Sequence, residues 1–200
     1  MGINMNPLSK SKSCVVIPTE YEYDALDINL VSKYPITISG MGKVNIAIKT
    51  LEMFYKHGFN RILLLGFCGA LFKHKIGDTV YPSHLIEGDY SEPNDNLINF
   101  RSGIHFFGHY KPQNANETTI ISQDHFLTEN PYKFIIGNPV CTDMESHAFA
   151  VTCERVGIAS SIVRVVSDIV GEKSAEDFFH SCKKYAPELN AIIKDFFLCE

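Results

Sequence analysis

The chain has 200 residues, 45% of them hydrophobic, and carries a formal net charge of −5 at pH 7. This length and composition suffice for one sizeable hydrophobic core, and no linker-like stretch divides the chain, so we expect a single domain. The acidic balance offers no basic stripe for a phosphate backbone, and no apolar run approaches the roughly 18 residues that span a bilayer. The composition therefore argues against nucleic acid and membranes as partners.

The cysteine pattern points to a reducing compartment. Six cysteines are scattered along the chain without a CxxC pair, at positions 14, 68, 141, 153, 182 and 199. The first residues contain no apolar export segment, and unpaired thiols are typical of the cytosol. We therefore expect a cytoplasmic protein with reduced thiols.

Strand and helix patterns alternate along the chain. Residues 1–13 are polar and lack periodicity, which predicts a flexible extension in front of one domain over residues 14–200. The alternation that follows indicates a single α/β domain with a mixed, mostly parallel β-sheet flanked by α-helices. Apolar strands are expected at 14–17, 36–39, 61–66, 119–122, 134–136 and 160–166, and helices at 21–31, 44–57, 143–156 and 174–198.

The segment 87–116 is the least regular part of the chain and is rich in asparagine, glycine and proline. Such a long connection predicts a surface excursion, which could serve as a lid or a partner contact. Within it, His105 and His109 have the i, i+4 spacing of a metal site on a helix, but the neighbouring Gly108 argues against a helix. We therefore expect neither a metal nor another cofactor.

Three acidic residues lie where strands should end or helices should begin: Glu22, Glu145 and Asp168. Ligands of α/β proteins bind at the carboxyl ends of strands, so this placement indicates one shared pocket. A second interpretation is structural, because Thr19 to Glu22 and Thr142 to Glu145 both match a capping box and an aspartate commonly forms turns. Capping and catalysis are compatible, since a carboxylate at a helix N-terminus can also face a cationic transition state.

Two glycine-containing segments could approach a ligand closely, SGMGKV at 39–44 and GFCGAL at 66–71. Neither has the spacing of a known phosphate-binding loop. Tight turns explain both segments equally well, so by themselves they do not indicate a function.

Seven segments, taken in chain order, resemble motifs of the nucleoside phosphorylase superfamily, specifically of its 5′-methylthioadenosine/S-adenosylhomocysteine nucleosidase branch. A single one of these motifs would be weak, whereas seven in order are specific. They are PTEYE at 18–22, SGMGKV at 39–44, GFCGAL at 66–71, IGDTV at 76–80, SQDHFL at 122–127, TDMESHAFA at 142–150 and IVRVVSDI at 162–169.

The resemblance implies a hydrolase that cleaves the N-ribosidic bond of adenine nucleosides and releases adenine. It implies that Asp168, helped by Ser167, protonates adenine N7, and that Glu22 orients and deprotonates the attacking water. An acid on the leaving group and a base on water are the general requirements of glycosidic cleavage. Asp168 would then need a pKa raised by burial or by a neighbouring carboxylate.

The resemblance also assigns the substrate-binding residues. Phe126 would stack on the purine, while its backbone and that of Leu127 meet the edge of the base. Glu145 would hold the ribose hydroxyls, with Met144 against the sugar. The remaining substrate-binding residues that the resemblance implies are Cys68 and Gly69.

Hydrolysis is expected in preference to phosphorolysis. Phosphorylases of this superfamily hold phosphate with arginines, one of them just before the segment at 66–71, where this chain has Leu64. Phe67 also replaces a serine that often binds phosphate in relatives. Phosphate would therefore find neither the paired N–H donors of an arginine nor a hydroxyl group. Two alternatives remain, namely a phosphate-dependent purine nucleoside phosphorylase and a non-catalytic nucleoside-binding protein.

The chain departs from the family pattern in two places. Only residues 29–35 separate the first helix from the segment at 39–44, where relatives usually have a β-hairpin, and the stretch after Pro82 diverges. The second region shapes the pocket for the 5′-substituent in relatives, together with a partner subunit, so the resemblance implies a homodimer. The substrate could be methylthioadenosine, S-adenosylhomocysteine, 5′-deoxyadenosine or 6-amino-6-deoxyfutalosine.

Overall fold

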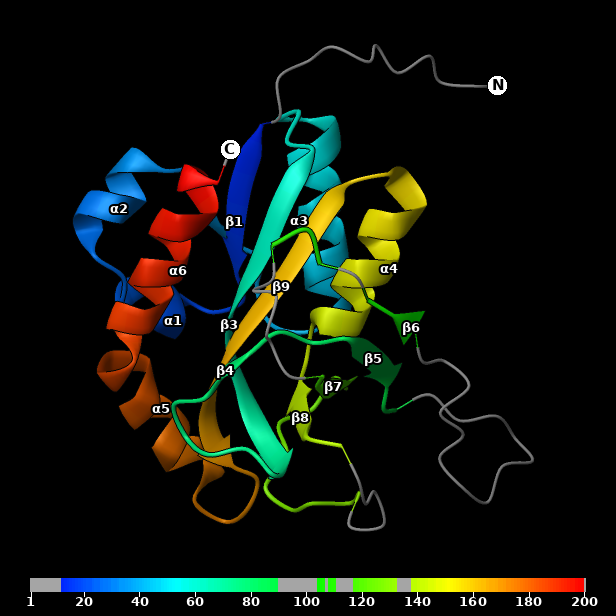
Figure 1. Ribbon diagram of the computed structural model, residues 1–200, viewed down its shortest axis with the longest axis vertical. Coiled ribbons are helices and arrows are strands. Elements are labelled where there is room, and N and C mark those ends of the chain that lie inside the picture. The colour runs from blue at the N-terminus through cyan, green and yellow to red at the C-terminus, as the bar shows by residue number, and fades with distance from the viewer. Residues whose placement is uncertain (1–11, 90–103, 107, 111–116, 133–137, 200) are drawn as a thin grey trace.

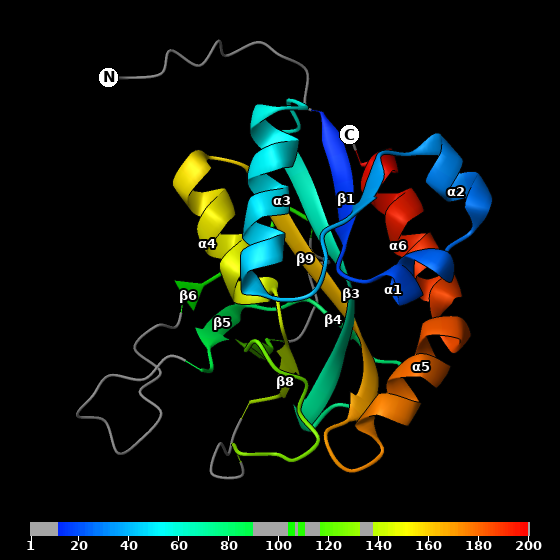
Figure 2. The ribbon, with the colours of Figure 1, turned by 180° about the vertical axis from the view of Figure 1, so that it is seen from behind.

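The computed structural model describes residues 12–89, 104–106, 108–110, 117–132 and 138–199. Within them, a nine-stranded sheet is covered by helices on both faces (Figure 1). Four helices, α1 (Glu20–Asp24), α2 (Ile28–Lys33), α5 (Ser174–Lys184) and α6 (Ala186–Leu198), cover one face, and α3 (Lys43–Tyr55) and α4 (Ser146–Val156) cover the other (Figure 2). No helix in this part of the chain combines the length and apolarity needed to cross a bilayer.

The long strand β3 is the centre of the sheet. One of its edges pairs in parallel with β9 along most of its length, while the other edge pairs first with β1, in parallel, and then with β8, antiparallel. The strands are β1 (Ser13–Ile17), β2 (Ile36–Ile38), β3 (Arg61–Phe72), β4 (Thr79–Val80), β5 (His84–Glu87), β6 (Ile104–His105), β7 (Thr119–Ser122), β8 (Val140–Asp143) and β9 (Ala159–Ile169).

Five of the eight strand pairings in the described residues are parallel: β1 with β2, β1 with β3, β3 with β9, β5 with β7, and β7 with β8. The predicted α/β fold with a mixed, mostly parallel sheet flanked by helices is therefore confirmed.

The carboxyl ends of β1 and β8 approach each other from opposite directions along one edge of β3. The pairing with β1 stops at Val16 opposite Leu64, and the pairing with β8 begins at Thr142 opposite Gly69. The β3 backbone between these positions therefore has no strand partner on this edge. Loops that follow strand ends converge at this gap, which is where α/β sheets place their ligands.

The core consists of two layers of apolar side chains, one on each face of the sheet. Successive residues of β3 point to opposite faces, so Ile62 and Leu64 pack toward α3 and α4, whereas Leu63 and Leu65 pack toward α6. Because β3 is buried on both faces, its sequence is a continuous apolar run rather than an alternating one. This rigid strand carries the backbone that lines the gap.

Several predicted element boundaries were wrong. The segment 66–71 is not a turn, because β3 continues through it to Phe72. The last strand also continues beyond Val166, to Ile169, so Asp168 lies within a strand. The helix expected from Asp143 begins only at Ser146, since the preceding residues form β8.

Two predicted helices are each divided in the structure. The helix expected at 21–31 is interrupted by Asp27, whose side chain accepts a hydrogen bond from Asn29 N and thereby starts α2. The helix expected at 174–198 is interrupted at Tyr185, because Pro187 cannot donate a helical hydrogen bond and is tolerated only in the first turn of a helix.

Some predictions lie outside the described residues. The strand expected at 134–136 and most of the surface segment 87–116 belong to this class. The N-terminal extension lies outside them up to residue 11, and Ser13 already belongs to β1.

Candidate active site

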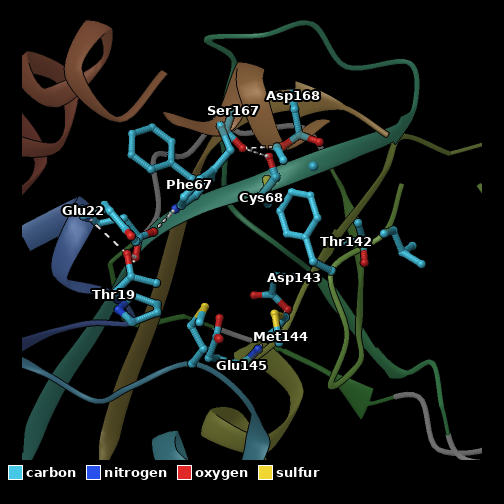
Figure 3. Close-up of a pocket in the computed structure, with 18 of the residues that line it drawn as sticks. Thr19, Glu22, Phe67, Cys68, Thr142, Asp143, Met144, Glu145, Ser167 and Asp168 are labelled. Carbon is cyan, nitrogen blue, oxygen red and sulfur yellow. Dashed lines mark hydrogen bonds between the residues drawn. The ribbon is translucent and has the colours of Figure 1, made fainter. Parts of the chain in front are cut away.

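A cavity of about 250 Å³ lies at the gap along the edge of β3. Its wall includes all nine residues predicted for the site, and Glu22, Glu145 and Asp168 lie on different sides of it (Figure 3). The predicted convergence of these carboxylates is therefore present in the fold. The nine residues are Glu22, Cys68, Gly69, Phe126, Leu127, Met144, Glu145, Ser167 and Asp168.

Glu22 both caps a helix and reaches the sheet. Extended backbone at Thr19 begins α1 with the predicted capping box, in which Thr19 N and Oγ1 donate to Glu22 Oε2 at 2.9 and 2.7 Å. The other carboxylate oxygen, Oε1, accepts a hydrogen bond from Phe67 N at 2.8 Å, in the gap of β3. Burial raises the pKa of Glu22, whereas Arg164 and these hydrogen bonds oppose the rise.

Glu145 is the first residue before α4, but its side chain does not cap that helix. The capping box predicted for Thr142 to Glu145 was wrong, because Thr142 Oγ1 donates to Ile121 O and the cap is supplied by Asp143. Glu145 Oε1 instead accepts a hydrogen bond from Gly42 N at 2.9 Å. This hydrogen bond orients the Glu145 carboxylate along the cavity wall.

The pKa of Glu145 lies close to neutral pH. Burial raises its pKa to about 7, Arg164 opposes that rise, and the neighbouring carboxylates Asp143 and Glu22 add to it. A perturbed carboxyl group in a cavity is typical of a functional site.

Arg164 was missed in the sequence although it organises one wall of the site. It lies on β9, is fully buried, and donates from Nη2 to Asp143 Oδ2 at 2.7 Å and to Glu145 Oε2 at 3.2 Å. Its Nη1 has no hydrogen-bond partner among the described residues. An arginine inside the apolar run 162–169 was the available signal, because a buried charge requires partners.

Glycine at position 66 allows Arg164 and Glu22 to approach the same place. A Cβ added to Gly66 would lie 2.8 Å from Arg164 Nη1 and 2.5 Å from Glu22 Oε1. A side chain here would therefore displace one or both groups. This requirement for close approach, and not a turn, explains why the β3 segment contains a glycine here.

Asp168 reaches the cavity through an irregularity in the pairing of β9 with β3. Cys68 pairs with Val166, and the next β3 residue, Gly69, pairs with Asp168, so Ser167 is an extra residue on β9. Ser167 Oγ lies 2.6 Å from Asp168 Oδ1 and donates to it. Burial raises the pKa of Asp168, which the hydrogen bond from Ser167 partly offsets.

Aromatic side chains form another part of the wall. The predicted Phe126 is 46% exposed at the mouth and meets Phe178 edge to face at 6.2 Å, and Phe178 meets Phe67 at the same distance. Phe179 contacts Tyr21 at 5.0 Å on the rim. The contribution of α5 was missed because Phe178 fits the apolar helical spacing of a core residue equally well.

The cavity wall is acidic. Glu22, Asp143, Glu145 and Asp168 belong to it, and the described residues that line it include no lysine or arginine.

In the described part of the chain, no group of three or more histidine, cysteine, aspartate or glutamate side chains could hold a metal ion. His105 is on β6, where its ring lies 4.3 Å from that of His84, and not on a helix.

A comparison with protein families decides the family. Residues 28–137 match the model of the phosphorylase superfamily. The chain belongs to the phosphorylase superfamily. The family match covers the segments at 39–44 and 66–71, whereas Glu22, Glu145 and Asp168 lie outside it. Family membership and the geometry of the carboxylates are therefore independent observations.

Solved structures with this superfamily fold include three that align with nearly all of the chain. One is an aspartate-to-asparagine mutant of the 5′-methylthioadenosine/S-adenosylhomocysteine nucleosidase (MTAN) of Helicobacter pylori, with 5′-methylthioadenosine in its active site (TM-score 0.72, 18% identity, 94% of this chain and 98% of that chain). Another is the futalosine hydrolase of Helicobacter pylori (TM-score 0.72, 18% identity, 92% and 96%). The third is a 5′-methylthioadenosine/S-adenosylhomocysteine nucleosidase from Neisseria meningitidis in complex with methylthio-immucillin-A (TM-score 0.70, 20% identity, 90% and 96%).

At these identities the structural matches show the fold of this chain alone, and they leave its reaction to the geometry of the site. A search of curated proteins found no match.

Proposed function

We propose that this protein is an adenine-nucleoside N-ribosidase, which uses water to cleave the bond between adenine and a 5′-substituted ribose. The proposal depends on one observation: Glu22, Glu145 and Asp168 come from three distant parts of the chain and face one cavity (Figure 3). Glycosidic cleavage requires an acid for the leaving group, a base for water, and negative charge near the developing oxocarbenium ion. These carboxylates supply the three functions.

Asp168 is the general acid in this proposal. It gives its proton to adenine N7 as the bond between N9 and C1′ breaks, so that adenine leaves as a neutral base. The raised pKa of Asp168 supports this role, because a carboxyl group must hold its proton near neutrality to donate it. The base lies against Phe126 and the backbone of Leu127, both in the cavity wall.

Glu22 and Arg164 bind the water. The attacking oxygen forms the bond to C1′, and its proton passes to Glu22. Both Glu22 Oε1 and Arg164 Nη1 lie beside Gly66, so a water between them would meet one hydrogen-bond acceptor and one donor. The same water would satisfy a buried nitrogen that has no hydrogen-bond partner among the described residues.

Glu145 binds the ribose hydroxyls, with Met144 against the sugar. Its carboxylate is held by Gly42 N and by Arg164, so it is already oriented before substrate binds. Once ionised, it also places negative charge near C1′, where positive charge develops. Cys68 and Gly69 line the same cavity, and Gly69 lies next to the Asp168 carboxylate.

Water is favoured over phosphate as the nucleophile by the charge of the cavity. Four carboxyl groups line it, while the described lining residues include no lysine or arginine, so a phosphate dianion would meet repulsion and no fork donor. Arg164, which contacts two of these carboxyl groups, already forms ion pairs with Asp143 and Glu145. Phe67 offers phosphate only an aromatic ring at its position in the wall.

The substrate carries an uncharged 5′-substituent. Phe67, Phe178, Phe179 and Tyr21 form an aromatic part of the wall that suits an apolar group such as a methylthio substituent. The structural neighbours with 5′-methylthioadenosine or methylthio-immucillin-A support this class of ligand. We therefore rank methylthioadenosine and 5′-deoxyadenosine ahead of S-adenosylhomocysteine and 6-amino-6-deoxyfutalosine.

Release of adenine from these four nucleosides, measured with and without inorganic phosphate, tests the proposal. We expect free adenine from at least one of them at a rate that phosphate does not change. Cleavage that needs phosphate would instead identify a phosphorylase. Binding of the nucleosides without any adenine release would identify a binding protein.

We further propose a cytoplasmic homodimer. The six cysteines are free, as expected in a reducing compartment. Val44, Ile48 and Tyr55 are each more than half exposed along α3, next to Met41 at the cavity rim, and a second copy would cover this apolar row. Sedimentation should give twice the chain mass, and Ile48→Lys should shift it toward the monomer; a wild-type monomer would contradict the proposal.

A further inference from the structure

Asp143 connects several elements at one side of the cavity. It is the last residue of β8 and is buried. Its Oδ1 accepts a hydrogen bond from Ser122 Oγ at 2.6 Å, and its Oδ2 accepts one from Arg164 Nη2 at 2.7 Å. Ser146 Oγ also donates to Oδ2. Every partner is a donor, which is the pattern that an ionised carboxylate requires.

The same carboxylate caps α4 in place of Glu145. The Ser146 N–H lies 3.2 Å from both Asp143 oxygens, whereas the side chain of the N-cap residue Glu145 makes no capping hydrogen bond. Asp143 therefore satisfies the first free donors of the helix. As a result, the Glu145 carboxylate is left to bind Gly42 N and to face the cavity.

Asp143 also holds Arg164 in one orientation. The guanidinium Nη2 contacts Asp143 more closely than Glu145, at 2.7 against 3.2 Å, and Ser146 Oγ lies 3.4 Å from both Nε and Nη2. This grip on one side of the planar group directs Nη1 toward Gly66 and Glu22. Without the Asp143 charge, the guanidinium would be attracted onto Glu145 or Glu22.

We propose that Asp143 is a positioning residue of the ribosidase reaction: it keeps Arg164 Nη1 aimed at the water that lies between Nη1 and Glu22 Oε1, and it keeps Arg164 from pairing more closely with Glu145. The inference rests on the proposed function and extends it to a residue of the cavity wall to which that function assigns no contact with water or substrate.

The charge of Asp143 has a consequence for the pH dependence. Loss of this negative charge removes one cause of the raised pKa of Glu145 and frees Arg164 to pair with Glu145 more strongly, so the pKa of Glu145 falls. If Glu145 must be ionised to act, the acidic limb of the rate profile then moves to lower pH. The groups that face Glu145 are Arg164 from β9, Asp143 from β8 and Glu22 from α1, with Asp168 and His125 in the same cavity wall.

The test is steady-state adenine release from about pH 5 to about pH 9 by Asp143→Asn, Asp143→Glu and Ser146→Ala. In Asp143→Asn we expect kcat to fall about tenfold or more, KM to change little, and the acidic limb of kcat/KM to move to lower pH. Asp143→Glu keeps the charge but moves it, so kcat should fall less and the limb should stay. Ser146→Ala removes a hydroxyl that contacts both Asp143 and Arg164, and it should leave the limb in place.

The inference is overturned if Asp143→Asn retains the wild-type kcat and limb, or if Asp143→Glu matches Asp143→Asn in both. Should Asp143→Asn fail to fold, Asp143→Glu decides alone: a lowered kcat with an unmoved limb supports the inference, and an unchanged kcat or a displaced limb contradicts it. If the wild-type protein releases adenine from none of the four nucleosides, the proposed function itself has failed. These results are distinguishable in one set of assays.

Discussion

The two ends of the cavity use carboxyl groups in opposite ways. At one end, Glu22, Asp143 and Glu145 surround Arg164 and accept backbone N–H groups, so negative charge is compensated there. At the other end, Asp168 accepts a hydrogen bond from Ser167 Oγ, and no cation of the described residues forms an ion pair with it. The two ends therefore differ in whether a cation faces the buried carboxyl groups.

The comparison shows how one cavity holds buried carboxyl groups in two different electrostatic environments. Burial penalises the charged form of every carboxyl group, but a neighbouring guanidinium and backbone donors favour that form at the Arg164 end. At Asp168 the effect of burial on the pKa is opposed by hydrogen bonds from Ser167 and Ser174 rather than by a cation. Arg164 therefore opposes the effect of burial on the pKa of Glu22 and Glu145, whereas it is not among the causes that act on the pKa of Asp168.

The first test of the difference between the two ends removes the cation, Arg164. Arg164→Ala leaves buried carboxylates without a counter-charge, so we expect the free energy of unfolding to fall by about 3–5 kcal/mol. Urea unfolding measures it. Arg155→Ala, at an exposed position in the last turn of α4, is the matched control and should cost at most about 1 kcal/mol. Equal losses in the two variants would show that Arg164 does not compensate the buried charges.

The second way is to remove the acid. Asp168→Asn should retain the fold and lose more than about 10²-fold in kcat, because an amide cannot donate the proton to adenine N7. Asp177→Asn is the matched control on α5, since Asp177 only adds to the raised pKa of Asp168, and its kcat should change little. Unchanged turnover in Asp168→Asn would refute the assignment of the acid.

A third variant pair separates capping from catalysis at the Arg164 end. Glu22→Gln should lower kcat by about 10²-fold, because the amide cannot take a proton from water. Thr19→Ala removes the other half of the capping box and should cost about 1 kcal/mol of stability with little loss of kcat. Adenine release and thermal unfolding of both variants provide the comparison. Equal kcat losses would mean that Glu22 acts mainly as a cap.

The smallest expected effect is a pH dependence of stability. The pKa of Glu145 is raised to about 7 in the folded protein, so the folded state binds more protons than the unfolded state between its ordinary pKa and that value. Its contribution to the free energy of unfolding is full below the ordinary pKa and is lost as pH rises through about 7. Wild type should therefore lose on the order of 1 kcal/mol more than Glu145→Gln between about pH 5 and about pH 8 in urea unfolding. Parallel curves would contradict the raised pKa.

The local patterns predicted more of the fold than of the site's internal contacts. The alternation of apolar strands and helices predicted the α/β class, and the capping box at Thr19 and Glu22 is present as predicted. The same motif at Thr142 to Glu145 failed, because the pairing of β8 with β3 and β7 extends the strand to Asp143. Identical short signals therefore had different outcomes, and strand pairing made the difference.

The helix boundaries and the glycine positions also depend on contacts that the local sequence does not show. A continuous apolar stripe predicted one helix over 174–198, but Pro187 divides it, and its N-terminal half contributes Phe178 to the cavity. The glycines at 66 and 69 looked like turn residues, whereas both lie in β3 and leave room for Glu22 and Asp168. Periodicity describes which face of an element is apolar, but not which neighbour that face meets.

By itself the sequence determined the fold class, the ordered motifs, and the identity of the three acidic residues, because these follow from apolar periodicity and from residue types at fixed spacing. Only the tertiary structure decided that β1 and β8 end opposite each other along β3, that Arg164 lies among Glu22, Asp143 and Glu145, and that Ser167 forms the bulge beside Asp168. These are contacts between residues far apart in the chain, and the protonation of a buried carboxyl group depends on such neighbours rather than on its own local sequence.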